Sequence, residues 1–130
     1  MLRGFSGMNF KDKLKRRIFG APQSYIEGVL DHRLGWGVRD DYAAYLIEYD
    51  EPEAEEALYL VASNPDESDD IAESCGEAVA EIWCRKGTLK VDALRKLRRA
   101  ALVEAVGIIS ARRPEWLPLL REEGLAGDER

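Results

Sequence analysis

The chain has 130 residues, which is enough for one domain with a single core and too short for a second independent domain. Hydrophobic residues make up 45% and charged residues 34%, and its 5 prolines and 11 glycines are too few for a disordered or collagen-like chain. No stretch approaches the roughly 18 apolar residues that span a bilayer, and cations interrupt the first 19 residues, unlike a secretory signal. We therefore expect one cytoplasmic domain over residues 1–130, with no membrane partner.

The net charge of −6 conceals a strong segregation of charge along the chain. Residues 1–39 hold 8 Lys/Arg and 3 Asp/Glu, and residues 83–130 hold 11 Lys/Arg and 7 Asp/Glu. Between them, residues 40–82 hold 15 Asp/Glu and no Lys or Arg. Self-repulsion in such a segment opposes folding, so a counter-charge is needed. Either the basic flanks fold over the acidic middle, or a basic partner supplies the cations.

Apolar spacing in the first half of the chain predicts three helices. The first runs from Pro22 to a glycine exit at Gly35-Trp36-Gly37, and the second covers Val38–Tyr49. Asp50 is the predicted N-cap of the third helix, because Glu53 follows three residues later and a proline lies in the first turn. This third helix is predicted to end near residues 63–65.

The second half contains the most amphipathic segment, a predicted helix over about 68–86 that ends at Gly87. A further helix is predicted over about 91–113, ended by Pro114, with a short turn over 115–120. Residues 1–9 and 122–130 are expected to fray. No run alternates with period two, so we predict an all-α fold of about five to six helices. The residues predicted to share its core are Ile71, Cys75, Val79, Ile82, Leu94, Leu102 and Ile109.

The side chains that serve catalysis and metal binding are sparse. Cys75 and Cys84 lie nine residues apart on one predicted helix, about 13.5 Å along its axis and on opposite sides, so they cannot form a disulfide. Together with the single His32 they fall short of a zinc site. No glycine-rich phosphate loop is present. We therefore expect buried free thiols, no catalytic residue, no metal and no cofactor.

Residues 53–63, the turn containing Pro65 and the segment Ile71–Ile82 together resemble one HEAT-type helical repeat. The segment Asp92–Ser110 is similar to the first helix of a following repeat, so the resemblance covers about residues 40–116. It implies antiparallel helix pairs stacked as a short HEAT-like α-solenoid, with its core over residues 50–116. It also implies that alanine and glycine in the second helix let neighbouring helices approach closely.

The acidic middle offers a candidate binding surface. Glu73, Glu77 and Glu81 repeat like charge at helical spacing, which costs an isolated helix about 0.2–0.5 kcal/mol per pair. The preceding acidic loop is expected to be exposed and unpaired. Arg98 falls within a predicted apolar stripe, so it is expected to pair with a carboxylate inside the fold. The predicted partner-binding residues are Asp66, Glu67, Asp69, Asp70, Glu73, Glu77 and Glu81.

These features favour a protein that binds a basic protein. The resemblance to short acidic bacterial HEAT-like proteins implies an immunity protein that neutralises a cognate toxin, such as a nuclease used in contact-dependent growth inhibition. Direct nucleic-acid binding by the middle segment is disfavoured because phosphate binding requires cations. The run Lys11–Arg17 could touch phosphate, although a solvated amphipathic helix is preferred. The alternatives are a generic HEAT-like scaffold or assembly factor and, less favoured, a carboxylate-based enzyme.

Overall fold

The computed structural model describes residues 22–127, and within that range the protein consists of seven α-helices, one 3-10 turn and no strand. This confirms the predicted all-α class for the described residues, whereas the expectations for residues 1–9, Lys11–Arg17 and 128–130 lie outside them. The elements are α3 (Pro22–Leu30), α4 (Trp36–Leu46), α5 (Pro52–Ser63), α6 (Asp69–Lys86), α7 (Val91–Arg95), α8 (Arg99–Arg112), η1 (Pro114–Trp116) and α9 (Leu117–Glu122).

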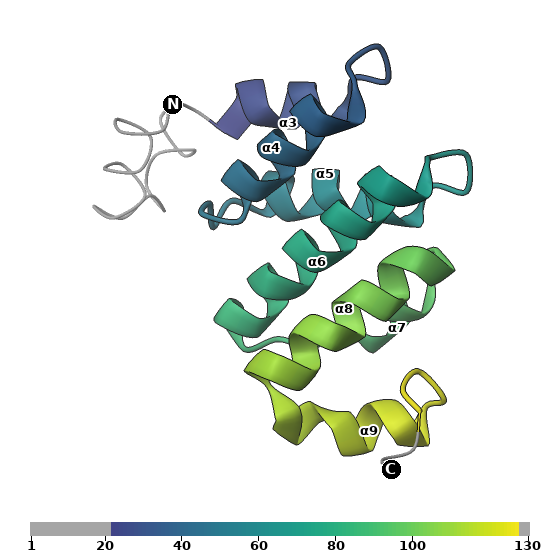
Figure 1. Cartoon of the computed structure of the whole chain (residues 1–130). Coiled ribbons are helices and arrows are strands. Elements are labelled where there is room, and N and C mark those ends of the chain that lie inside the picture. The colour runs from purple at the N-terminus through teal and green to yellow at the C-terminus, as the bar shows by residue number, and fades with distance from the viewer. Residues whose placement is uncertain (1–21, 128–130) are drawn as a thin grey trace.

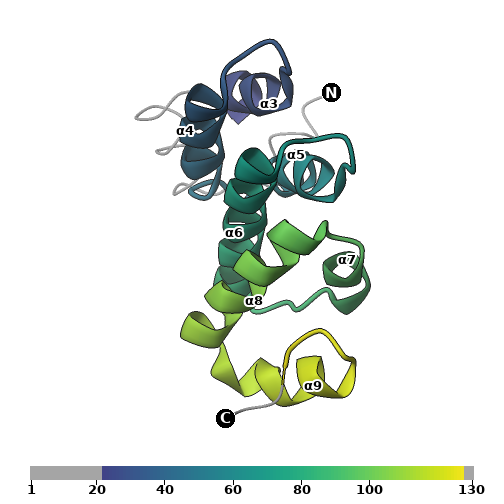
Figure 2. The same cartoon turned by 45° about the vertical axis from the view of Figure 1, so that its right-hand side comes forward.

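The helices follow one another through space in the order of the chain, with α3 and α9 at opposite ends (Figure 1). Helix α6 runs through the middle and contacts α4, α5 and α8. In the view of Figure 2, one side of the molecule is formed by α3, α5, α7 and α9, and the other side by α4, α6 and α8. We call the α4, α6 and α8 side the even layer and the other side the odd layer.

The core is built mainly from α6, on which ten residues are buried. The predicted core residues are fully buried at Ile71, Cys75, Val79 and Ile82 on this helix, and at Leu94 and Ile109 outside it. Leu102 is an exception, because it is only partly buried. Ala101 and Ala105 are instead the buried α8 residues in this region, together with Ile109. The predicted core is thus confirmed at every position except Leu102.

The first two helix boundaries differ from the prediction. Helix α3 ends at Leu30, because Asp31 turns the chain by accepting the backbone N–H of Arg33 on its carboxylate at 3.0 Å. Gly35 then serves as the N-cap of α4, so Trp36 begins the next helix and does not lie in a glycine exit. In the same way Glu51, not Asp50, precedes α5 as its N-cap.

The predicted helix over 91–113 is broken, which is the largest error of the sequence prediction. Residues 96–98 separate α7 from α8. There the backbone N–H of Arg98 donates to the carbonyl of Ala62 at the end of α5 (3.1 Å), and Leu97 is buried. The interruption allows a backbone hydrogen bond to the neighbouring helix α5, and the local sequence pattern does not predict such a contact. The predicted ends of α6 at Gly87 (φ 71°) and of α8 before Pro114 are confirmed.

The end of the described chain is organised by a helix cap. Gly124 adopts φ 76°, and the N–H of Leu125 donates to the carbonyl of Leu120 at 2.8 Å. Leu120 is fully buried. The chain from Glu122 as far as residue 127 therefore follows a hydrogen-bonded turn in place of the expected fraying.

Helices α6 and α8 approach so closely at Gly76 that no side chain fits there. A Cβ on Gly76 would lie 2.7 Å from the carbonyl oxygen and 2.9 Å from the Cα of Ala101. Those contacts are with backbone as well as with the side chain, so the two helices would have to move apart. By contrast, Gly107 on α8 has open space around its missing Cβ.

We predict opposite effects of glycine-to-alanine substitution at these two sites. Gly76→Ala should lower the free energy of unfolding by about 1–3 kcal/mol, because it overpacks the α6–α8 contact. Gly107→Ala should raise it by up to about 1 kcal/mol, since alanine is the better helix former. Urea denaturation of both variants measures the difference. Equal effects of the two substitutions would contradict the close approach.

Candidate functional site

A buried ion pair lies at the start of the candidate acidic surface. The guanidinium of Arg39 on α4 donates to both carboxylate oxygens of Glu67, at 2.8 and 2.9 Å, and its Nε donates to the carbonyl of Val29 at 2.9 Å. Both side chains are 5% exposed. The hydrogen bonds from Arg39 lower the pKa of the Glu67 carboxyl despite its burial. One arginine thus joins the end of α3, the start of α4 and the α5–α6 loop.

This ion pair corrects the expectation for Glu67, which was predicted to be exposed and available to a partner. The loop before α6 folds inward at this residue because Arg39 needs a buried counter-charge. Asp69 is exposed but is also engaged, since Arg98 donates to its carboxylate at 2.7 Å and to the carbonyl of Glu67. The prediction that Arg98 pairs within the fold is thereby confirmed.

Cations from the two basic flanking segments form ion pairs with part of the acidic segment, residues 40–82. Arg85 binds Asp50, Lys86 and Lys90 bind Glu55, and Arg112 binds Glu81. With Glu67 and Asp69, five of the fifteen carboxylates in residues 40–82 have a described ion pair. The internal explanation of the charge segregation is therefore correct for these five.

We predict that Glu67 is essential for the fold and not for binding. Glu67→Gln should lower the free energy of unfolding at pH 7 by about 3–5 kcal/mol, because it leaves the buried Arg39 charge without its counter-charge. Since folding lowers the pKa of Glu67, its contribution is present above the unfolded pKa, near 4.5, and is lost as pH falls through the folded value. Chemical denaturation at pH 7 and pH 3 tests this. The exposed neighbour supplies the control, because Asp66→Asn should change stability by less than about 0.5 kcal/mol.

Four carboxylates that have no described ion pair belong to the helices of the even layer. Glu73 and Glu77 lie one turn apart on α6, and the carboxyl of Glu77 shares a hydrogen bond with that of Glu104 on α8. Asp40 of α4 interacts electrostatically with Glu77 from the other side. Within residues 22–127, no ion pair joins any of these four carboxylates to a Lys, Arg or His. We call Asp40, Glu73, Glu77 and Glu104 the acidic face.

The other carboxylates of the acidic face disfavour the ionised form of Glu77, which lies among them. Partial burial raises the pKa of Glu77, and the hydrogen bond with Glu104 and the nearby charges of Glu104, Asp40 and Glu73 raise it further. Three consecutive even-layer helices thus present like charges to one another. Their repulsion is a cost that cations from outside the described chain would remove.

The pKa of Glu77 leads to a second stability prediction. A carboxyl whose folded pKa is raised above 4.5 contributes stability below the unfolded pKa, and that contribution is lost as pH rises through the folded value. Glu77→Gln should therefore raise the melting temperature at pH 7 and should not raise it at pH 3, where the wild-type side chain is already neutral. Thermal melting followed by circular dichroism at the two pH values measures this. A destabilised variant at pH 7 would show that the Glu77 charge is compensated.

The remaining predicted site residues divide between the loop and the two ends of α6. Asp66 and Asp70 are exposed; the backbone N–H of Asp66 donates to the side chain of Asn64 at 2.9 Å. Asp70 lies in the first turn of α6, where a carboxylate favours the helix dipole. Glu81 is held at the other end by two 3.1 Å hydrogen bonds from Arg112. The seven predicted residues therefore do not form one free surface.

Two members of the acidic face, Asp40 and Glu104, were not among the predicted residues. Helical spacing could not find them, because they belong to different helices and meet α6 only through packing. The sequence did contain a pattern from which the burial of Arg39, the partner of Glu67, could have been predicted. Arg39 shares the spacing of the buried Ala43 and Leu46, so it occupies an apolar stripe, which is the argument applied to Arg98.

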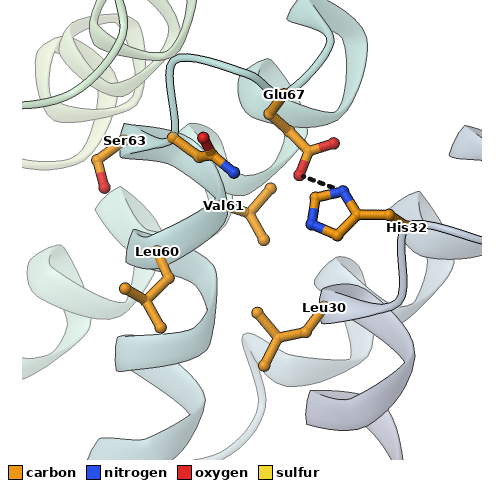
Figure 3. A pocket seen from close by; sticks show the side chains of 7 residues that line it. Leu30, His32, Leu60, Val61, Ser63 and Glu67 are labelled. Carbon is orange, nitrogen blue, oxygen red and sulfur yellow. Dashed lines mark ion pairs between the residues drawn. The ribbon is translucent and has the colours of Figure 1, made fainter.

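Three cavities accompany these side chains. One, of about 320 Å³, lies between α3 and the end of α5, where His32 Nδ1 is 3.5 Å from the carboxylate of Glu67 (Figure 3). A second, of about 380 Å³, continues along α3 and α5. The third, of about 320 Å³, lies at the ends of α6 and α8, beside Arg85, Arg112 and Arg113. None of the three is lined by Glu77 or Glu104.

The two cysteines are both buried and free, as predicted. Burial raises the pKa of the Cys75 thiol to about 12, which leaves it un-ionised at neutral pH. In the part of the chain that the structure describes, no cluster of three or more His, Cys, Asp or Glu is arranged to hold a metal ion. None of the helices between residues 22 and 127 has both the length and the apolar character of a membrane span.

No family model matches the sequence, and no match was found among curated proteins or solved structures. The resemblance to HEAT-type repeats therefore rests on the residues quoted above.

Proposed function

We propose that this protein is a protein-binding module and that its acidic face binds a basic partner protein. The observation that carries the proposal is the apposition of Glu77 and Glu104, with Glu73 and Asp40 beside them and no cation on them in the described chain. A partner that places Lys or Arg side chains among these carboxylates relieves their repulsion. It would also lower the pKa of Glu77 on binding.

The same face offers an apolar anchor. Trp36 lies one turn before Asp40 on α4, hence on the same side of that helix, and it is 59% exposed. Tryptophan is enriched among the residues that contribute most to protein–protein binding energy. Tyr42 and Tyr45 pack against Tyr25, at ring-centroid distances of 5.9 and 5.1 Å. We therefore take Trp36, which shares the Asp40 side of α4, as the aromatic residue beside the acidic face.

The partner that we propose is a toxin domain with a basic cleft, which makes this protein an immunity protein of bacterial HEAT-like type. The support for this step is the resemblance in sequence, together with the alternation of consecutive helices between the two layers (Figure 2). A nuclease fits best, because a cleft that binds phosphate is lined by cations that would pair with carboxylates. Complementary charge would also speed association. A scaffold with a different basic partner is the alternative and predicts the same surface.

A carboxylate-based enzyme is the second candidate, favoured by the single observation that one carboxyl of a close pair has a raised pKa. General acid–base catalysis uses such a carboxyl when it lines a pocket that holds substrate. Glu77 is instead an exposed residue, and the three cavities described above lie elsewhere. The arrangement therefore supports charge pairing with a macromolecule better than it supports catalysis.

We predict that reversing the charge of Glu73 and Glu77 abolishes partner capture while the fold survives. Tagged wild-type protein and the Glu73→Lys/Glu77→Lys variant would each be used to isolate binding proteins from the native host, with identification by mass spectrometry. A basic protein should be recovered with the wild type and lost with the variant. Its association rate, measured with the purified partner, should fall as salt rises, because surface attraction is screened over about 8–10 Å at physiological ionic strength.

The matched control is Asp92→Lys, which reverses one exposed carboxylate on α7 in the odd layer. This variant should retain the partner and a similar association rate. Thermal melting of all three proteins separates loss of binding from loss of structure. Recovery of the same basic protein by wild type and by the doubly reversed, folded variant would place the interface on another face.

A further inference from the structure

A groove with exposed leucines runs between α3 and α5 on the odd layer, and at its α6 end it is also lined by the polar residues His32, Ser63, Asn64 and Glu67. Its two cavities, of about 320 and 380 Å³, adjoin each other, because Leu30 and Leu60 line both. These leucines are 36% and 48% exposed. Figure 3 shows Leu30 from α3 and Leu60 and Val61 from α5 around one of the cavities. Exposed leucines that line a groove between two helices are typical of sites that bind an amphipathic helix.

The rim of the groove is acidic at the end where α5 begins. Glu53 and Glu56 line the larger cavity beside Ile26 and Ala57, and both are exposed. Within the described chain neither carboxylate has an ion pair with a cation. An occupant with apolar residues on one side and cations next to them would satisfy both the floor and the rim of the groove.

We propose that the groove binds residues 10–19 of the same chain. This segment carries Phe10, Leu14 and Ile18 at spacings of four, so that a helix would present them on one side. Its cations are Lys11, Lys13, Lys15, Arg16 and Arg17. The proposal thus adds an internal counter-charge for the acidic middle, on the opposite layer from the partner site.

Length and connection favour this occupant. Ten helical residues extend about 15 Å, comparable with the roughly 18 Å of the 12-residue α5. Only Gly20 and Ala21 separate the segment from Pro22, the first residue of α3. Two residues are enough to connect antiparallel helices, and α3 itself forms one wall of the groove. The occupant is therefore tethered beside its site at a high effective concentration.

Limited proteolysis of the full chain with trypsin tests the proposal, because the basic run supplies five cleavage positions within seven residues. Mass spectrometry would follow the rate of cleavage after Lys11, Lys13, Lys15, Arg16 and Arg17. We expect slow cleavage in the wild type. Leu60→Glu, which places a charge in the groove floor, should accelerate it about tenfold or more. The control, Leu119→Glu, changes a leucine of similar exposure (43%) on α9 and should leave the rate unchanged.

A second variant keeps the test independent of any loss of stability in Leu60→Glu. Glu53→Gln/Glu56→Gln removes the acidic rim and leaves the apolar floor intact, so it should also accelerate cleavage, less strongly and with unchanged melting. Cleavage of the wild-type segment as rapid as in both variants would overturn the proposal. Protection that appears only as protein concentration rises would also overturn it, since the occupant would then come from a second copy.

Discussion

The bidentate ion pair between Arg39 and Glu67 is the constraint on which most of the structure depends. It fixes the end of α3 through the Val29 carbonyl, the start of α4 through the arginine backbone, and the α5–α6 loop through Glu67. The carbonyl of Glu67 accepts in turn from Arg98, so the same loop holds the break between α7 and α8. A buried pair of this kind stabilises only if every polar atom is satisfied, and here the geometry provides those partners.

Two other arginines also join helix ends to neighbouring elements. Arg85 donates to the carbonyl of Tyr49 at 3.0 Å and to Asp50 at 2.7 Å, which joins the end of α6 to the α4–α5 loop. Arg113 donates to the carbonyl of Cys84 at 2.9 Å, which joins the end of α8 to α6. The flanking segments therefore supply cations chiefly to helix ends and loops. The carboxylates midway along the even layer receive none, and this leaves the acidic face available to a partner.

The two layers consequently present different chemistry. The even layer combines close carboxylates with the exposed Trp36, a combination that suits a basic protein surface. The odd layer presents exposed leucines with an acidic rim, which suits a short basic helix. Both proposals follow from one property of the chain, the absence of any cation between residues 40 and 82. They concern separate surfaces, so each can be tested without the other.

Features that depend on local spacing and local sterics could be predicted from the sequence. The extent of α6, its glycine end at Gly87, the stop before Pro114 and the burial of Cys75 all follow from helical period and backbone preference. Tertiary structure alone decided the break at residues 96–98, the burial of Glu67 and the meeting of Glu77 with Glu104. Each of these joins groups 27 to 36 positions apart in the chain, and such contacts are set by how helices pack. Helical periodicity predicts which side of a helix is apolar. Which charged groups of other helices lie next to a given side chain depends on how the helices pack.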